Sequence, residues 1–438
     1  MRLRRIGLTR FKAFTQAEIE VAPLTVLIGH NNAGKSTVLH ALAMLAQTVE
    51  QPGREQLATS GPRVDLGNDP LALAHGARHE GWGISLIWGV EAEGFPIDVE
   101  LDVKTHRPIQ YGQIFDVVRT VSIRVEPVTI RLTGLWPNVN PNEAFRIEAT
   151  GPQIDISTKV AAGMNAPWTG YPMATFPFGR LDVDGVKNGN TEAIQRTAIQ
   201  LATPLLMNAL PQALRAFRYV GADRHVNTSA FEVLQGPVEN PQNAKEIVNT
   251  LAYNREIRER VSAECRRVFN FGIDTQLIPG PHQTLVAVDK NGRALNAVNL
   301  GAGLVQFAWI LAHLDMAVAD ALVYPTHNPI PFVGIEEPEL HLHPAQQPDI
   351  AQILVNYVNA NRQTISTTQS EHLLMALLQL VLEGQLKAED LAVYYVDHGI
   401  AQRLEVDEKG RLSGGLKGFF EANRTELTKR LDQLITDD

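Results

Sequence analysis

The sequence predicts an α/β fold in which helices pack on a sheet. Two observations support this class. After residue 285, short apolar runs that are typical of strands alternate with helical patterns, which is the arrangement of a sheet covered by helices. Near the amino end, the buried-strand pattern of Leu24–Ile28 leads through a glycine-rich loop into a helical pattern. We therefore expect the sheet to take strands from two stretches that lie far apart in the sequence.

The amino-terminal stretch predicts strands and one helix. Residues 3–21 carry short alternating apolar runs, as in paired strands, and residues 81–132 are mostly strand-like. In the helix after the glycine-rich loop, the apolar residues recur at spacings of four, three and four, which places them on one face. They are Val38, Leu42, Leu45 and Val49.

The middle of the chain is less regular, and a compact pattern returns after it. Residues 134–178 contain six prolines and are expected to form an insertion or a loop region. Residues 191–218 and 245–269 predict helices. The later elements are expected in the order helix 304–314, strand 332–335, helix 350–357, strand 364–367, helix 373–382 and strand 391–396.

Composition narrows the class of protein. The chain has 438 residues, enough for two or three domains or for one domain with large insertions. Its net charge of -9 excludes a generally basic nucleic-acid-binding protein, although a local basic groove is still allowed. Cys265 is the single cysteine, so we expect no internal disulfide and a reducing compartment. The start lacks the apolar segment of a signal peptide, and the charge-free apolar runs fall short of the ~20 residues that cross a bilayer. We expect a cytoplasmic protein that does not contact a membrane.

The glycine-rich loop is the strongest functional motif. Residues 29–37 fit the pattern G-x-x-x-x-G-K-[ST] at every required position, between a buried strand and an amphipathic helix. Such a loop turns backbone N–H groups toward a phosphate, and the helix adds the positive end of its dipole. Lys35 is expected to contact the β- and γ-phosphates of ATP, and Ser36 to ligate Mg²⁺. The alternative is a glycine turn with an incidental lysine. The residues expected to bind the nucleotide are Gly29, Asn31, Asn32, Ala33, Gly34, Lys35, Ser36 and Thr37.

Two acids follow the predicted strand 332–335. Glu336 is expected to hold Mg²⁺ through water, and Glu337 to orient and deprotonate the attacking water. The alternative is a strand that ends in a solvated acidic turn. The sequence has no Asn-Lys-x-Asp stretch for guanine recognition, which disfavours a GTPase, and the long separation between loop and acids disfavours a small-molecule kinase.

Several segments resemble the ABC-type ATPases of the SMC, RecF and OLD group. The opening 10–14 (Arg-Phe-Lys-Ala-Phe) and the glycine-rich loop resemble the start of these proteins. Residues 299–306 resemble their signature motif, residues 336–344 their Walker B and D-loop, and residues 367–372 their switch segment. The resemblance covers roughly 1–80 and 290–438, and it is strongest to compact OLD-like bacterial AAA proteins without a coiled coil or a nuclease domain.

The resemblance implies an ABC-ATPase head of the P-loop NTPase class, with a mixed sheet, an amino-terminal antiparallel β region and an inserted helical lobe. Residues 1–135 would form the first half of the head, residues 136–290 the inserted lobe, and residues 291–438 the second half. In such heads the signature of one subunit completes the ATP site of another. A homodimer or a higher even oligomer is therefore implied, with ATP and Mg²⁺ as cofactors.

Two positions depart from the pattern of the group. Gly301 stands where a serine normally touches the γ-phosphate, so Gly301, Ala302 and Gly303 would hold phosphate through backbone N–H groups. The alternative is a glycine-rich start of a helix without a ligand. Gln369, the third expected catalytic residue beside Lys35 and Glu337, stands where the group has histidine and cannot carry a proton charge. We expect slow turnover, with ATP acting mainly as a clamp.

Two weaker patterns have plainer explanations. His341 and His343 with Glu339 have a spacing that occurs in metal sites, but a role in the D-loop or in surface packing is favoured. Arg215, Arg218 and Arg224 lie in a mildly basic stretch, which we interpret as a solvated helical face rather than a nucleic-acid groove.

Three functions remain open at this point. The first is an ATP-gated dimeric sensor in anti-phage defence or DNA maintenance, with a separately encoded effector protein. The second is a RecF-like ATPase that binds DNA in repair. The third is a nucleotide-gated scaffold with negligible hydrolysis.

Overall fold

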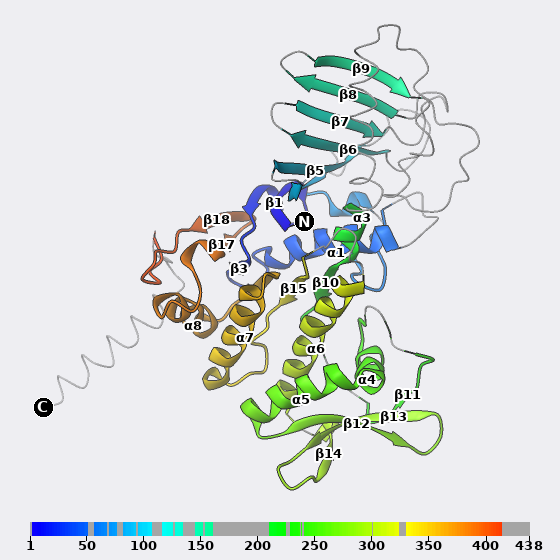
Figure 1. The fold of residues 1–438 in the computed structure, drawn as a ribbon, viewed down its shortest axis with the longest axis vertical. Coiled ribbons are helices and arrows are strands. Elements are labelled where there is room, and N and C mark those ends of the chain that lie inside the picture. The colour runs from blue at the N-terminus through cyan, green and yellow to red at the C-terminus, as the bar shows by residue number, and fades with distance from the viewer. Residues whose placement is uncertain are drawn as a thin grey trace, which may run out of the picture.

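The structure is a computed structural model that shows three stacked parts (Figure 1). An eight-stranded sheet lies at one end, a six-stranded sheet with its helices lies in the middle, and a small lobe lies at the other end. The structure describes residues 2–50, 57–67, 70–76, 82–92, 95–106, 116–125, 128–134, 145–151, 154–160, 210–224, 228–236, 238, 241–299, 301–323 and 330–413.

The eight-stranded sheet is antiparallel throughout. It confirms the expected amino-terminal β region, and its first hairpin pairs Ile6 with Ile19. The sheet continues through β8 and β9, which lie in the stretch expected to be irregular, because alternating short runs pair there, with Ala149 opposite Ile156. The strand order is β2 (Phe14–Glu20), β1 (Arg2–Phe11), β4 (Gly83–Ala92), β5 (Phe95–His106), β6 (Asp116–Val125), β7 (Val128–Gly134), β8 (Phe145–Gly151) and β9 (Ile154–Val160).

The six-stranded sheet is mixed, as expected, since all strands are parallel except the last. It joins strands from both ends of the sequence. Its order is β10 (Phe217–Val220), β15 (Phe332–Glu336), β16 (Gln363–Thr368), β3 (Leu24–Ile28), β17 (Leu391–Asp397) and β18 (Ile400–Leu404).

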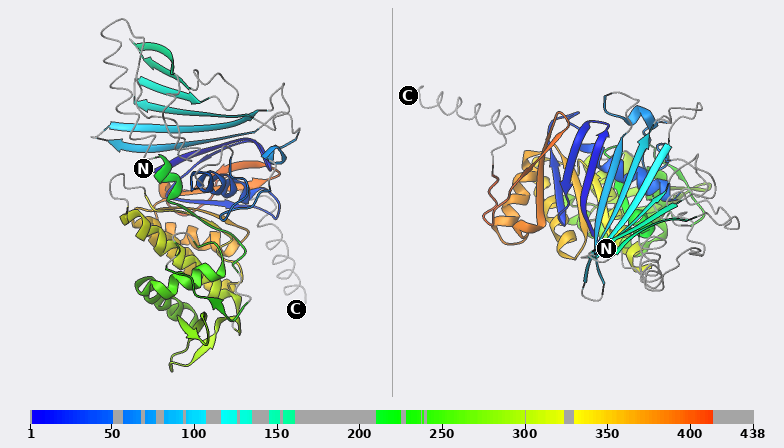
Figure 2. Two further views of the ribbon diagram at one scale, coloured as in Figure 1. Left: turned by 90° about the vertical axis from the view of Figure 1, so that its right-hand side faces the viewer. Right: turned by 90° about the horizontal axis from the view of Figure 1, so that it is seen from above.

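Two hydrophobic cores cover the two faces of this sheet. Along β3, Leu24, Val26 and Ile28 belong to one core, and Leu27 belongs to the other, as the two-residue repeat of a strand requires. The first core contains α6 (Ala302–Val323), α7 (Gln347–Asn359) and α8 (Glu371–Leu382). The second contains α1 (Lys35–Glu50), which lies between the two large sheets (Figure 2, left), together with α3 (Leu210–Arg215).

Helix α6 is the central helix of its core. Its window Ala302–Ala319 is long and apolar enough to cross a membrane by composition, but 72% of it is buried inside the protein. Packing accounts for the apolar character of α6, because the side chains of Phe307, Ile310 and Ala312 are fully buried.

The lobe combines two helices with a four-stranded sheet. The single helix expected over residues 245–269 is divided at Asn254, whose side chain accepts a hydrogen bond from the Ile257 N–H and so starts the second helix. The elements are β11 (Phe231–Glu232), α4 (Ala244–Tyr253), α5 (Arg255–Phe269), β12 (Gly272–Ile278), β13 (His282–Val288) and β14 (Ala294–Asn296).

The sheets cross the boundaries that the sequence suggested at residues 135 and 290. Strands β8 and β9 extend the eight-stranded sheet, and β10 forms the edge of the six-stranded sheet. A helix was expected over residues 191–218, of which residues 191–209 lie outside the described residues. In the described part, α3 is helical as expected, but the last two residues belong to the strand β10. The division into three segments stays a prediction.

Candidate active site

The glycine-rich loop connects β3 to α1 at the carboxyl end of the sheet. Asn32 and Gly34 have positive φ angles of 62° and 110°. A Cβ at position 34 would also lie 2.7 Å from the Cβ of Ala13, so only glycine fits. Asn31 and Asn32 are exposed at the tip of the loop, whereas Gly29, Ala33 and Thr37 are buried. The start of α1 and these turns form the concave, N–H-lined arrangement that binds phosphate.

Lys35 is folded into this loop. Its Nζ donates hydrogen bonds to the carbonyls of Gly29 and His30, each at 2.8 Å. Burial lowers the pKa of Lys35, while the nearby carboxylates of Glu337, Glu339 and Glu336 act to raise it. The ammonium group therefore lies within electrostatic reach of the acids that follow β15.

Glu336 is the last residue of β15 and is 8% exposed. Burial acts to raise its pKa, but hydrogen bonds with His40, Ser36 and Tyr219 outweigh burial, so the pKa is lowered overall. The structure thus brings together Ser36 and Glu336, the two residues expected at Mg²⁺. A hydroxyl and an ionised carboxylate are the oxygen donors that Mg²⁺ prefers, and both fit that ion.

Two residues that the sequence analysis did not place in the site support Glu336. The Nζ of Lys12 lies 2.7 Å from Nδ1 of His40, and Nε2 of His40 lies 3.3 Å from Oε1 of Glu336. Because an ammonium group can only donate, Nδ1 accepts, and Nε2 carries the hydrogen that faces Glu336. Burial lowers the pKa of Lys12, and Glu336 acts to raise it.

Glu337 and the switch segment are joined by direct hydrogen bonds. Glu337 has a φ of 43°, and its N–H donates to the carbonyl of Thr367 at 2.8 Å. The side-chain amide of Gln369 donates to the Glu337 carboxylate. The carboxylate of Glu339 accepts from the Thr368 hydroxyl at 2.6 Å and from the Gln369 N–H at 3.1 Å. Burial raises the pKa of Glu339, and the charge of Glu337 adds to this effect.

The signature segment is linked to this group through the D-loop. Gly301 is exposed, Ala302 begins α6, and Gly303 is buried; Leu300 lies outside the described residues. A Cβ on Gly303 would lie 2.6 Å from the carbonyl oxygen of His341, so the two segments are in close contact. The start of α6 provides unpaired N–H groups and a positive dipole end beside the D-loop.

The histidines of the D-loop have structural partners. Nδ1 of His343 accepts from the Ala345 N–H at 3.2 Å and caps a short helical turn. The carboxylate of Glu339 is not directed at these histidines but accepts hydrogen bonds from Thr368 and Gln369 of the switch segment. Among the residues that the structure describes, no group of three potential ligands could hold a metal ion.

Four residues near the acids were not predicted to belong to the site: Lys12, His40, Tyr219 and Arg224. His40 could have been found, because it lies one helical turn after Ser36 and shares its face. Tyr219 and Arg224 could not, because the contacts of both depend on β10 lying beside β15. Arg218 and Arg224 are each 1% exposed, so these two residues form neither a solvated face nor an open groove.

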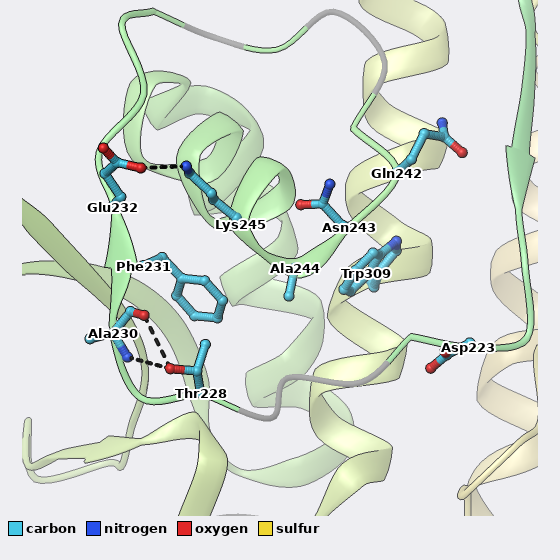
Figure 3. A pocket seen from close by; sticks show the side chains of 10 residues that line it. All are labelled: Asp223, Thr228, Ala230, Phe231, Glu232, Gln242, Asn243, Ala244, Lys245 and Trp309. Carbon is cyan, nitrogen blue, oxygen red and sulfur yellow. Dashed lines mark hydrogen bonds and ion pairs between the residues drawn. The ribbon is translucent and has the colours of Figure 1, made fainter. Parts of the chain in front are cut away.

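A cavity of about 460 Å³ lies elsewhere, between the lobe and α6 (Figure 3). Phe231 and Trp309 contribute aromatic rings to it, and the ion pair of Lys245 with Glu232, at 2.7 Å, lies on its wall. None of the residues expected to bind nucleotide or metal lines this cavity.

Comparisons with known proteins place these features in a family. A family model described as "AAA ATPase domain" matches residues 1–71 and 182–374. No curated protein matches the sequence.

The SMC head domain from Thermotoga maritima is 13% identical, with 93% of this chain and 100% of that chain covered and a TM-score of 0.40. An SMC head bound to the C-winged helix domain of ScpA is 11% identical, with 92% and 97% covered and a TM-score of 0.42. The recombination mediator protein RecF with ATPγS is 10% identical, with 92% and 98% covered and a TM-score of 0.36.

The family match agrees with the resemblance that the motifs carry to the ABC-type ATPases of the SMC, RecF and OLD group. It spans more than half of the chain and includes the glycine-rich loop, the acid pair and the switch segment. The chain therefore belongs to the AAA ATPase domain family.

Proposed function

We propose that this protein binds ATP with Mg²⁺ and hydrolyses it, and that the nucleotide controls a dimer. The observation that carries the proposal is the meeting of the phosphate loop with the acid pair. The side chain of Ser36 forms a hydrogen bond with Glu336. Burial lowers the pKa of Lys35, and the charges of Glu337 and Glu336 act to raise it.

Each residue has a distinct part in this proposal. Lys35 exchanges the carbonyls of Gly29 and His30 for phosphate oxygens when ATP binds. Ser36 and Glu336 would hold Mg²⁺, and the ion would supply positive charge beside the phosphates of ATP. Glu337 orients and deprotonates the attacking water, and Gln369 holds the carboxylate of Glu337 by a hydrogen bond.

The proposed dimer uses the signature segment. Gly301 is exposed and directly precedes α6, a helix of 22 residues. The N–H groups at the start of α6 are therefore available to a phosphate on a second copy. Such a contact is isologous and gives two equivalent ATP sites. Since the γ-phosphate would be held by both copies, ATP would favour the closed dimer and hydrolysis would favour its opening.

We propose that this cycle serves as a sensor or clamp in anti-phage defence or DNA maintenance in the cytoplasm, with a separately encoded effector. A nucleotide-gated scaffold is the second candidate, and Gln369 favours it. A neutral amide holds the general base, so hydrolysis would be slow and the closed state long-lived.

Mass measurement by light scattering tests the dimer. The wild type, Lys35→Ala and Glu337→Gln would be compared without nucleotide and with ATP and Mg²⁺. We expect Glu337→Gln to become a dimer only with ATP, and Lys35→Ala to keep one mass under both conditions. A Glu337→Gln variant that binds ATP but shows no change of mass would contradict the clamp and leave the nucleotide site intact.

A further inference from the structure

Arg224 is a buried cation that holds the main chain of the acid pair. It follows β10 and is 1% exposed. Its Nη1 donates to the carbonyls of Gly221 and Glu336, both at 2.6 Å, and its Nη2 donates to the carbonyl of Glu337 at 2.7 Å. A guanidinium group is planar and has several donors in a fixed arrangement, so one side chain can bridge carbonyls at the ends of two strands.

The charge of Arg224 is maintained in spite of its burial. Burial lowers its pKa to about 10, while Glu339, Glu336 and Glu337 act to raise it. The guanidinium is therefore protonated at neutral pH. A buried charge is costly unless it is paired and hydrogen-bonded, and here three carbonyls and three nearby carboxylates meet that requirement.

Glu337 is the residue that needs such support. Its φ of 43° lies in the left-handed region, which a residue with a side chain adopts at a cost. Its N–H is fixed by the carbonyl of Thr367, and its own carbonyl is fixed by Arg224. With the peptide groups on both sides fixed, the side chain of Glu337 leaves the backbone in one direction, toward Gln369.

We propose that Arg224 is a positioning residue for ATP hydrolysis. It holds Glu337 in the left-handed conformation that aims the carboxylate at the attacking water, and it takes no part in nucleotide binding. This inference rests on the proposed ATPase function. If Arg224 had only a structural role, its replacement would instead lower the stability of the fold and reduce ATP binding and turnover together.

Arg63 provides a matched control. It is also buried, at 4% exposure, and it also donates to carbonyls at the start of β10, those of Phe217 in the strand and of Arg215 before it. The carboxylate of Glu50 is a further partner, at 2.6 Å, so these contacts hold the start of β10 rather than the acid pair after β15. Lysine at either position keeps the charge but cannot bridge several carbonyls.

The experiment compares the wild type, Arg224→Lys and Arg63→Lys. Melting temperature, affinity for ATP with Mg²⁺, kcat and KM are measured for each, below the lowest melting temperature. We expect Arg224→Lys to lose about 100-fold in kcat, because a misplaced general base has an effect of this order. Its ATP affinity should stay within about 3-fold of the wild type, and Arg63→Lys should keep its kcat despite a comparable loss of stability.

Three results would overturn the inference: a normal kcat in Arg224→Lys, a parallel loss of ATP affinity and kcat, or an equal loss of kcat in Arg63→Lys. If Arg224→Lys does not fold, Arg224→Gln is measured by the same criteria, since a neutral amide at this site is buried at lower cost. A wild type that binds ATP without hydrolysing it would contradict the proposed ATPase function, which separates that failure from a failure of Arg224 alone.

Discussion

The side-chain amide of Gln369 donates a hydrogen bond to the carboxylate of Glu337, while the backbone N–H of Gln369 donates to Glu339. The switch segment therefore holds the proposed general base and the D-loop at once. An amide can fix the direction of a carboxylate, but it stays neutral at any pH and adds no charge to the site.

The first prediction concerns this amide. Gln369→His introduces a side chain that can both hydrogen-bond Glu337 and carry a proton, so we expect the steady-state ATPase rate to rise severalfold. Phosphate release under saturating ATP measures the change, and Gln369→Asn, a shorter amide, serves as the control. A fast wild type that histidine leaves unchanged or slows would remove the proposal of slow turnover.

The second prediction concerns Lys35. Its two hydrogen bonds to loop carbonyls are available for exchange with phosphate oxygens, so Lys35→Ala should lower the affinity for ATP by about 100-fold, the loss of two charge-assisted hydrogen bonds. At 100 times its Kd, ATP should stabilise the wild type by about 2.7 kcal/mol and leave Lys35→Ala nearly unchanged at the same concentration. Thermal unfolding with and without ATP measures both effects. An equal shift in the two proteins would disprove the role of Lys35.

The third prediction compares the two glycines of the signature segment. A side chain at Gly303 would meet the carbonyl of His341, so Gly303→Ser should destabilise the fold by about 1–3 kcal/mol and abolish the ATP-dependent change of mass. Gly301→Ser has open space around its Cβ and lies just before α6, where serine caps a helix well. Denaturant unfolding should show Gly301→Ser at least as stable as the wild type. Equal stability losses in the two variants would contradict the contact with the D-loop.

The fourth prediction uses Cys265, which is fully buried on α5. Burial raises the pKa of its thiol, so the reactive thiolate is scarce in the folded lobe between pH 7 and 9. Labelling by a maleimide should be at least about 100-fold slower than in the unfolded chain, without the tenfold rise per pH unit that an exposed thiol shows. Mass spectrometry follows the reaction without ambiguity, because the chain has one cysteine. Rapid labelling of the folded protein would show that α5 is not packed as described.

The parts of the site that local sequence specifies were predictable. The phosphate loop follows from one strand, one glycine pattern and one helix that are adjacent in the chain, and β3 and α1 confirm this order. The acid pair follows from an apolar strand that ends in Glu336, and β15 confirms that strand. Both segments lie within the match to the AAA ATPase domain family.

The parts that depend on distant pairing were not predictable from the sequence. Strand β10 has only four residues, and it is a strand because Tyr219 and its neighbours pair in parallel with β15, more than 100 residues away. The placement of Tyr219 and Arg224 beside the acids follows from that pairing. For the same reason β8 and β9 were missed, since each short strand is stabilised by its neighbour in the sheet.

Steady-state ATP hydrolysis by Glu337→Gln, measured together with its affinity for ATP and Mg²⁺, tests the central claim most directly. The account predicts that the variant binds ATP about as tightly as the wild type and hydrolyses it at least about 100-fold more slowly, because the amide cannot accept the proton of the attacking water. Hydrolysis by Glu337→Gln at the wild-type rate would show that the acid pair after β15 does not carry out the reaction.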